Sequence, residues 1–471
     1  MPKIIQKNLF SLSILLVFFT SGVLAQEDLS FKQIDSLSYN HYMYKNYTDL
    51  IKVGEKAIKQ NTDYFYLRMR LGIAYYQKHQ YRMASKHFEQ ALNFNTGDSL
   101  AIEYLYYSYK FSNDDISATK CLQYSTSPKA HDLKKKQTVL KNIYLFYGFR
   151  MYNTDHIEET LFSDFETEME SYPKPIVIND DTSKYYYTEI SLPQYYSNIQ
   201  IGATFRILPS WQVGIAYQNF NVDHHSTIVN YKDTLLSNPD KWEGEYLMAN
   251  SVNNIKASQF YLNNTFGISN KFELSVFANY QYYTNTKTSD VDYINDTSFE
   301  VSNVLLGASL IFKQSYYQLF MGANTLSITH KPTLQSDFGI TVFPFANNQL
   351  ALGLMGTFIH NDKNTKDSWV VIPSIAYSPI ERLTLFGSAS WGKRNNWQTN
   401  NGYVIYNGLF DINSSYNLSA NTRIYRRLYF KLEYEYLNTT SYSFSKLPET
   451  EIFKEINFIT HSIIGGLIWE F

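Results

Sequence analysis

The stretch YYSNIQIGATFRILPSWQVGIAYQNFNV, residues 195–222, contains two alternating segments joined by a short turn. In the first segment, apolar residues occupy every second position, with polar residues or glycine between them. These apolar positions are Ile199, Ile201, Ala203, Phe205 and Ile207. A period of two is typical of a β-strand, in which successive side chains point to opposite faces. The turn Leu208-Pro209-Ser210 is short enough to make the two strands antiparallel neighbours.

The same alternation recurs from about residue 141 to the end of the chain. It is clear in 272–282, 416–422 and 428–436, where apolar residues alternate with Glu, Lys, Asn, Gln or Ser. We predict about fourteen strands, near 141–153, 195–207, 211–222, 255–267, 271–285, 298–313, 315–328, 334–345, 349–361, 367–378, 382–394, 409–424, 427–440 and 456–471. A soluble sandwich also alternates, so this pattern alone does not identify the class of fold.

The lengths of the links between strands favour a membrane barrel. Even-to-odd links are tight: 208–210, 269–270, 314, 347–348, 379–381 and 425–426. Odd-to-even links are longer and polar, and the first two are expected over about 154–194 and 223–254. Short turns on one rim and long loops on the other are typical of transmembrane barrels. We therefore predict an all-β transmembrane antiparallel barrel over 139–471.

Residues 26–138 have a helical period instead. Small residues and aromatics follow the spacing of a tetratricopeptide repeat, a helix-turn-helix unit of about 34 residues. The residues that carry this pattern, and that we expect to pack the repeat, are Leu71, Gly72, Tyr75, Ala84, Phe88 and Ala91. Weaker copies lie 34 positions to either side. The alternative is an ordinary helical bundle; we predict a small all-α helical-repeat domain with two and a half to three repeats.

The first 25 residues resemble a secretory signal peptide. Lys3 and Lys7 precede an apolar run, and Val23-Leu24-Ala25 places small residues at −3 and −1 of a cleavage site. The alternative is an uncleaved anchor helix. Beyond this segment no stretch reaches the ~20 apolar residues of a membrane helix. We expect an outer-membrane location, with the helical domain in the periplasm on the side of the short turns.

The last strand ends Leu467-Ile468-Trp469-Glu470-Phe471. Leu467, Trp469 and Phe471 alternate and would face lipid. This ending resembles the C-terminal aromatic signal by which the barrel-assembly machinery recognises its clients, so that machinery is an implied partner. The 42 Tyr and 32 Phe residues also fit aromatic girdles at the two membrane surfaces, in contact with lipid and lipopolysaccharide. Trp211, Trp369 and Trp391 fall near predicted strand ends.

A periplasmic tetratricopeptide-like domain before an outer-membrane barrel resembles three groups of proteins by layout. These groups are YaiO-like proteins, surface-lipoprotein assembly modulators and exopolysaccharide-export porins. The resemblance rests on the repeat near 64–97 and on the final strand, and no motif chooses among the groups. It implies export or assembly of a surface component, a polysaccharide or a protein, and a periplasmic protein partner for the repeats. That implication is an analogy at the level of the fold.

No motif in the sequence predicts a catalytic, cofactor or metal site. His224-His225 supplies two adjacent imidazoles, too few for a closed metal site. His461 and Ser462 are neighbours in a strand and should point to opposite faces. The acidic residues Glu158, Glu159, Asp164, Glu166, Glu168, Glu170, Asp180 and Asp181 match no calcium loop and are interpreted as a solvated loop.

Composition narrows the partners. The chain carries 41 Lys and Arg against 43 Asp and Glu, so no nucleic-acid partner is expected. The single cysteine, Cys121, cannot form an internal disulfide. Three functions stay open: a non-enzymatic barrel with a protein-docking domain that aids export or assembly, a passive channel or structural barrel, and an outer-membrane lipid-modifying enzyme. The lumen of a barrel of this size can be open or plugged.

A membrane barrel can be recognised by its solubility and by its mobility on a gel. The mature polypeptide should require detergent for extraction and should migrate differently on a gel before and after boiling, because a closed barrel resists unheated detergent. A chain that stays soluble without detergent and shows a single mobility would contradict the barrel.

Overall fold

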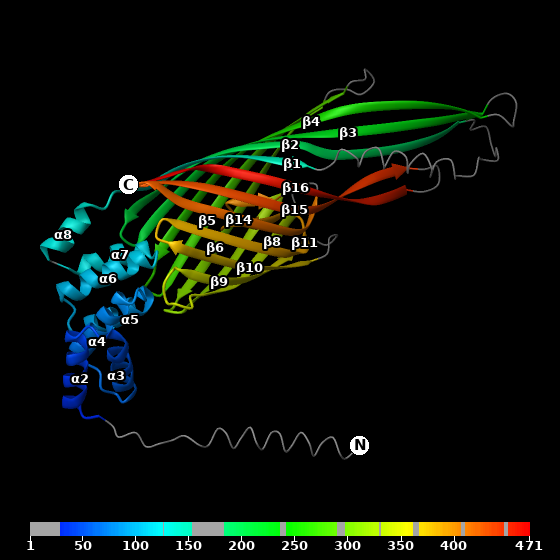
Figure 1. The fold of residues 1–471 in the computed structure, drawn as a ribbon. Helices are drawn as coiled ribbons and strands as arrows, with labels where there is room; N and C mark the ends of the chain where they lie inside the picture. Colours follow the sequence, from blue (N-terminus) through cyan, green and yellow to red (C-terminus); the bar gives the residue numbers. More distant parts are fainter. Residues whose placement is uncertain are drawn as a thin grey trace, which may run out of the picture.

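The computed structural model describes residues 29–125, 127–152, 183–235, 242–289, 297–328, 331–360, 367–406, 410–446 and 451–471. It contains a helical module followed by a closed barrel (Figure 1). The predicted signal peptide over 1–25 and the predicted acidic loop over 158–181 lie outside these residues. The last helix of the module ends at Lys135, and the first strand begins at Leu140.

The helical module consists of three helix pairs and a final short helix. Its helices in the described residues are α2 (Phe31–Met43), α3 (Tyr47–Lys59), α4 (Phe65–Gln77), α5 (Tyr81–Phe94), α6 (Ser99–Phe111), α7 (Asp115–Cys121) and α8 (Pro128–Lys135). The turn within each pair contains one residue with a left-handed backbone: Lys45, His79 and Asn113, with φ of 57°, 58° and 58°. These three positions are 34 residues apart, which is the predicted period of the repeat.

Small residues let the paired helices approach closely. Gly72 in α4 faces the ring of Phe88 in α5, and a Cβ at Gly72 would lie 2.6 Å from that ring. Gly54 in α3 faces Leu71 at the same distance. Leu71 and Phe88 are fully buried in the shared core. None of the described helices has the length and apolar character needed to cross a bilayer.

Fourteen antiparallel strands close into one barrel, as the sequence predicts. The strands are β1 (Leu140–Tyr152), β2 (Ser183–Leu208), β3 (Trp211–Leu235), β4 (Trp242–Gly267), β5 (Phe272–Ser289), β6 (Thr297–Lys313), β7 (Tyr317–Ile328), β8 (Lys331–Val342), β9 (Leu350–His360), β10 (Ser368–Ile380), β11 (Leu383–Arg394), β14 (Asp411–Tyr425), β15 (Leu428–Lys446) and β16 (Glu451–Glu470). Neighbours in the chain are neighbours in the barrel, and β1 closes the ring against β16. Because the number of strands is even, both barrel termini lie at the short-turn rim.

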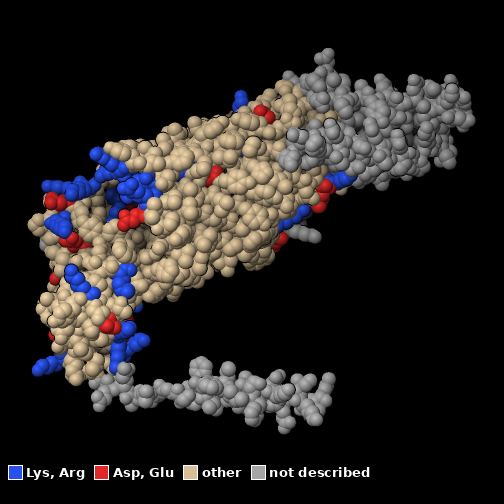
Figure 2. Space-filling model, viewed as in Figure 1, with Lys and Arg blue, Asp and Glu red and all other residues tan. Residues whose placement is uncertain are grey.

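The two faces of each strand differ in polarity. In β5, Val276 and Tyr280 face outward and are 45 % and 43 % exposed, whereas Asn279 and Gln281 face the lumen and are buried. The same division holds along β14 and β15. On the face shown in Figure 2, the middle of the barrel wall is almost free of charged side chains, which gather mainly towards the module. An apolar exterior around a polar interior is the arrangement that suits a barrel surrounded by lipid.

The structure corrects two predictions about the links. Residues 183–194, 223–235 and 242–254 belong to β2, β3 and β4, although the sequence predicts loops there. Their sequences lack the strict alternation of apolar and polar residues on which the prediction of strands relied. The link between β8 and β9 spans 343–349 rather than two residues. Pro344 follows β8 and has no amide hydrogen to continue the ladder.

The helical module is bound to the short-turn rim. Asp115 at the start of α7 forms ion pairs with Lys141 of β1 and Arg206 of β2, at 2.9 and 2.8 Å. The adjacent Asp114 pairs with Lys313 at the end of β6, at 3.0 Å. Burial alone would raise the pKa of Asp115, but the nearby ammonium groups, that of Lys141 first, hold it well below its usual range. Asp115 is therefore charged at every physiological pH, and the contact persists.

The link between β8 and β9 forms a second contact with the module. The guanidinium carbon of Arg82 in α5 lies 3.5 Å from the centroid of the Phe343 ring. The Arg82 amide donates to the carbonyl of Ala346, a residue fully buried in the core of the module. Asn347 and Asn348 donate to the carbonyls of His79 and Phe111. The module thus spans the rim from β1 to β9.

Substitution of Asp115→Asn should loosen this attachment, because Lys141 and Arg206 would lose the charge that pairs them. Breaking a largely buried ion pair costs about 3 kcal/mol, so amide hydrogen exchange in α7 and in the 208–210 turn should accelerate by about 100-fold. The matched control is Asp49→Asn, which breaks an exposed ion pair with Lys52 in α3. Equal exchange in D115N and the wild type would contradict the attachment.

Candidate functional site

The candidate site is the lumen of the barrel, where a hairpin folds inward from the link between β11 and β14. Its two short strands, β12 (Trp397–Thr399) and β13 (Val404–Tyr406), pair with each other and with no barrel strand in the described part of the chain. The turn Asn400-Asn401-Gly402 joins them, and all three residues have positive φ. We call residues 395–406 the inner hairpin.

Side-chain amides of three neighbouring strands hold the tip of the inner hairpin. Gln218 of β3 and Gln259 of β4 both donate to the carbonyl of Tyr403, at 3.2 and 2.8 Å. Asn279 of β5 donates to the carbonyl of Gly402 at 2.6 Å. These backbone carbonyls have no ladder partner at the turn, so the wall satisfies them.

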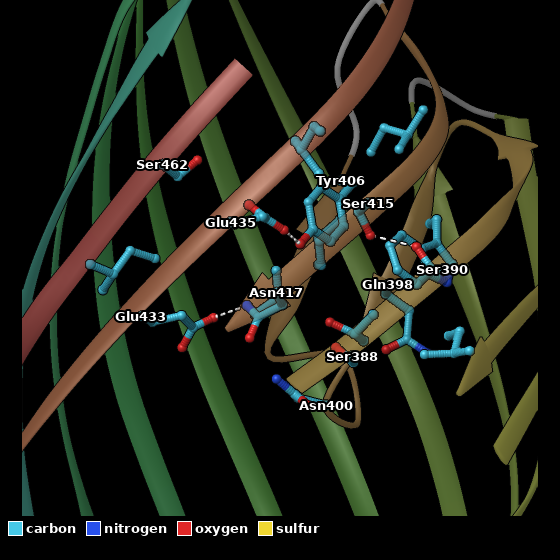
Figure 3. Close-up of a pocket in the computed structure, with 18 of the residues that line it drawn as sticks. Ser388, Ser390, Gln398, Asn400, Tyr406, Ser415, Asn417, Glu433, Glu435 and Ser462 are labelled. Atoms are coloured by element: carbon cyan, nitrogen blue, oxygen red, sulfur yellow. Dashed lines mark hydrogen bonds between the residues drawn. The ribbon is translucent and has the colours of Figure 1, made fainter. Parts of the chain in front are cut away.

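The flanks of the inner hairpin bind the wall on both sides. On one side Gln335 of β8 exchanges two hydrogen bonds with the backbone of Gln398, at 3.0 and 3.2 Å. On the other side the hydroxyl of Tyr406 donates to the Glu435 carboxylate of β15 at 2.5 Å. The inner hairpin therefore bridges opposite parts of the barrel wall, and Figure 3 shows the contact between Tyr406 and Glu435.

Apolar contacts also fasten the inner hairpin. Trp397 packs on Ile359 of β9 and Val370 of β10, and all three side chains are buried. At the tip, Gly402 has a φ of +76°, a region that favours glycine. A Cβ at Gly402 would lie 2.5 Å from a methyl carbon of Leu305 in β6. Glycine is thus required both by the backbone and by the close approach to the wall.

An arginine anchors the point at which the inner hairpin leaves the wall. Arg394, the last residue of β11, is 1 % exposed. Its guanidinium donates to the hydroxyls of Ser390 and Ser415, at 2.5 and 3.2 Å. The same group lies 4.2 Å from the centroid of the Trp397 ring. These contacts set the direction in which the hairpin enters the lumen.

A cavity of about 1260 Å³ remains beside the inner hairpin. Strands all around the barrel contribute to its lining, and Figure 3 shows the part formed by β11, β14, β15 and β16. Arg150 of β1 forms an ion pair with Glu435 at 3.0 Å and donates to the Ser462 hydroxyl at 2.7 Å. The lining continues to Gln318 and Thr341, near the short-turn rim. The inner hairpin narrows the lumen but leaves this cavity beside it.

The structure places the predicted repeat residues together. Leu71, Ala84, Phe88 and Ala91 are fully buried, and Tyr75 is 6 % exposed, all in the core between α4 and α5 that Gly72 also borders. The hydroxyl of Tyr75 donates to Glu55 of α3 at 2.9 Å and so links neighbouring repeats.

Of the predicted C-terminal signal residues, Leu467 and Trp469 lie on the outer face of β16, and Phe471 directly follows the strand. Leu467, Trp469 and Phe471 are 45 %, 43 % and 42 % exposed. Leu467 is opposite Leu145, and Trp469 is opposite Ile143, in the seam that closes the barrel. The backbone of Phe471 donates to the Lys141 carbonyl at 2.8 Å. These three residues therefore complete the seam while their side chains stay accessible.

The structure separates the members of each histidine motif. His224 and His225 lie in β3 rather than in the predicted loop, and adjacent strand residues point to opposite faces. Similarly, Ser462 contacts Arg150 in the lumen, whereas His461 contacts the Tyr434 hydroxyl on the outer face, at 2.8 Å. Within the described residues, no group of three or more His, Cys, Asp or Glu side chains is arranged to hold a metal ion.

Sequence reasoning missed the inner hairpin. Residues 395–408 were expected to form one of the long polar loops. The available signal is the Asn401-Gly402 dipeptide between two short segments that contain Trp397, Val404 and Tyr406, because Asn-Gly favours tight hairpin turns. That signal predicts a hairpin but does not predict that it enters the lumen.

Comparisons with known proteins give weak structural similarity and no family. No protein-family model matches the chain, and the search of curated proteins finds no match. Among solved structures, MamA AMB-1 is 19 % identical over 23 % of this chain, with a TM-score of 0.20, and the chain spans only 57 % of MamA. A TodX mutant described as a monoaromatic hydrocarbon channel is 8 % identical over 70 % of this chain and 91 % of its own, with a TM-score of 0.43. A Pseudomonas aeruginosa FadL homologue is 8 % identical over 77 % and 95 %, with a TM-score of 0.39. Similarity at this level identifies no function.

Replacement of residues 396–406 by a short Gly-Ser linker should widen the lumen, because the segment that narrows it is removed. In planar bilayers the variant should conduct several-fold more current per channel than the wild type. Heat-modifiable gel mobility serves as the control for folding. If the conductance of the folded variant equals that of the wild type, the inner hairpin does not limit the passage.

Proposed function

We propose that this protein is a non-enzymatic outer-membrane conduit that aids export or assembly of a surface component, with its helical module as a periplasmic docking domain. The observation that carries the proposal is the attachment of the module to the short-turn rim through Asp114, Asp115 and Arg82. That attachment holds the helical module, a type of fold that commonly binds proteins, at one mouth of the lumen.

The membrane assignment is supported by the barrel itself. Only helices and closed barrels satisfy their backbone groups inside lipid, and single-chain closed barrels of this kind belong to outer membranes. In such barrels the short turns face the periplasm, so the module would be periplasmic. The exposed Leu467, Trp469 and Phe471 fit recognition by the barrel-assembly machinery, and the apolar exterior fits contact with lipid and lipopolysaccharide.

The docking role is supported by an aromatic surface on the module. Tyr76 of α4 contacts Tyr104 and Phe111 of α6, with ring centroids 5.2 and 6.2 Å apart. Tyr107 lies beside Phe111 at 6.3 Å, and Phe111 is 47 % exposed. We call Tyr76, Tyr104, Tyr107 and Phe111 the aromatic face. Partly exposed aromatic residues are enriched at protein interfaces.

The aromatic face lies next to the barrel. The carbonyl of Phe111 accepts a hydrogen bond from Asn348, in the link between β8 and β9. A partner bound to the aromatic face would therefore sit beside the mouth of the lumen. Stacked helical repeats commonly use such surfaces to bind proteins. The module would then act first, in delivery to the barrel, and the lumen would act second, in transfer across the membrane.

A passive channel is the second candidate, and the cavity along the lumen favours it. The two functions differ in what they require of the module. A passive channel needs the barrel and the inner hairpin but not the aromatic face. A docking role needs the barrel, the inner hairpin and the aromatic face. Substitutions in the aromatic face therefore separate the two functions.

The substitutions Tyr107→Asp and Phe111→Asp should leave insertion and conductance unchanged, because neither residue belongs to the barrel. Deletion of the gene should remove a surface component, and each aspartate variant should reduce the amount of that same component. The measurement is the protein and polysaccharide on intact cells of the source bacterium. Tyr124→Asp is the matched control, since Tyr124 is 68 % exposed and lies outside the aromatic face.

Two outcomes would contradict the proposal at different levels. If the deletion strain loses a surface component but the two aspartate variants keep it, the docking role is wrong and only the passive channel remains. An unchanged surface in the deletion strain would overturn the role in export or assembly.

A further inference from the structure

We infer that the short-turn rim carries a binding site for the headgroup of an anionic phospholipid. The site consists of Arg382 in the turn between β10 and β11, and of Arg426 and Arg427 in the turn between β14 and β15. We call these three residues the arginine cluster. The inference goes beyond the proposed function, because it concerns the lipid around the barrel and not the molecule that the barrel transfers.

The two turns of the arginine cluster are neighbours on the rim. β11 pairs with β14, and the backbone of Arg423 donates to the Arg382 carbonyl at 2.8 Å. The backbone of Glu470 donates to the Arg427 carbonyl at 2.9 Å, which places the second turn beside the end of β16. All three side chains of the cluster are exposed. Figure 2 shows Lys and Arg side chains gathered at this end of the barrel.

The positive charges of the cluster are not compensated by ion pairs. Within the described residues, Arg382, Arg426 and Arg427 form no ion pair with any carboxylate, the terminal one of Phe471 included. Like charges held close together repel each other. An anion bound among the three guanidinium groups would relieve that repulsion.

The nearest acidic side chains in the sequence are directed elsewhere. Burial, and then the nearby Glu381 carboxylate, raise the pKa of the Tyr81 phenol in α5, so Glu381 acts on the helical module. Glu470 follows Trp469, which faces outward, and successive strand residues point to opposite faces. Glu470 therefore points towards the lumen, and the outer side of the rim keeps its positive charge.

The backbone of the second turn does not account for the arginines. Tyr425 pairs with Leu428, so Arg426 and Arg427 alone form the turn. Arg426 has a φ of +33°, in the left-handed region that favours Gly or Asn in such turns. Arginine has no conformational advantage at this position, and its guanidinium has no carboxylate partner in the folded chain. Its chemistry is therefore available to a ligand.

Exposed apolar side chains border the cluster on the barrel wall. Ile380, at the end of β10, is 60 % exposed, and Ile424 and Tyr425, at the end of β14, are 54 % and 58 % exposed. Farther from the rim, Leu418 is 62 % exposed. The guanidinium carbon of Arg426 lies 5.3 Å from the centroid of the Tyr425 ring. Tyrosine and arginine at the end of an apolar wall are typical of the level at which lipid headgroups lie.

An anionic phospholipid matches both parts of this surface. Its phosphate accepts paired hydrogen bonds from guanidinium groups, and its acyl chains cover the apolar wall below them. A soluble anion would leave the apolar side chains uncovered. A zwitterionic lipid brings its own positive charge to the cluster. Lys135 and Lys136, exposed at the end of α8 just before β1, extend the positive surface beyond β16.

The test uses Trp469, which lies opposite Leu428 beside the second turn and is 43 % exposed. The full chain is reconstituted in phosphatidylcholine vesicles that contain brominated phosphatidylglycerol or brominated phosphatidylcholine, because bromine quenches nearby tryptophan. The difference between the chain and its Trp469→Phe variant isolates the signal of Trp469. Phosphatidylglycerol should quench this signal at a lower mole fraction than phosphatidylcholine does. The preference should fall as KCl rises from about 0.1 M to about 1 M, since salt screens the attraction.

Substitution of Arg426→Gln together with Arg427→Gln should weaken the preference for phosphatidylglycerol. One basic residue near an anionic lipid surface contributes about fivefold to binding, so the loss should be about fivefold for each arginine removed. The variant with Arg426→Lys and Arg427→Lys keeps both charges and should keep most of the preference. Heat-modifiable gel mobility shows that each barrel has folded.

The matched control is Lys32→Gln together with Lys59→Gln. These substitutions also remove two exposed positive charges, but from α2 and α3, which Figure 1 shows at the end of the module away from the barrel. The lipid preference of this variant should equal that of the wild type.

Three outcomes would overturn the inference. They are equal quenching of the wild type by the two lipids, an unchanged preference in the folded double glutamine variant, and loss of the preference when inorganic phosphate replaces chloride at constant ionic strength. The last would identify a site for a free anion. None of these measurements depends on transfer through the lumen, so each failure would leave the proposed export role in place. Failure of the export role would likewise leave the lipid site standing.

Discussion

The structure depends on closure of the backbone hydrogen-bond ladder between β1 and β16. Inside lipid no water is available for amide and carbonyl groups, so a strand with a free edge would be strongly unfavourable. Antiparallel pairing from Asn142 with Glu470 to Tyr152 with Thr460 removes that edge. Because the seam joins the first strand to the last, the barrel forms only when the C-terminal residues are in place.

Closure also determines what the interior contains. Side chains alternate between the outer face and the lumen, so an apolar exterior requires the other half of each strand to face inward, where polar groups are hydrated or paired. That polar interior receives the inner hairpin, whose carbonyls are bound by Gln218, Gln259 and Asn279. The constriction therefore uses the same polar side chains that the barrel needs on its inner face.

The even number of strands brings the module and both barrel termini to one rim. Asp115 is then close enough to bind Lys141 and Arg206, although these residues are distant in sequence from each other. The helical module becomes part of the mouth of the barrel instead of a separate domain on a tether. Because the module lies at this mouth, a partner bound to it would be beside the lumen.

Both the repeats and the barrel can be predicted from the sequence, because their signals are local and periodic. The spacing of Gly72 and Phe88, and the alternation in 272–282, follow directly from the geometry of helices and strands. The approach of Gly402 to Leu305 and the ion pair between Arg150 and Glu435 are seen only in the folded chain. Those contacts join segments far apart in the chain, and no local pattern records which polar residues the closed barrel brings face to face.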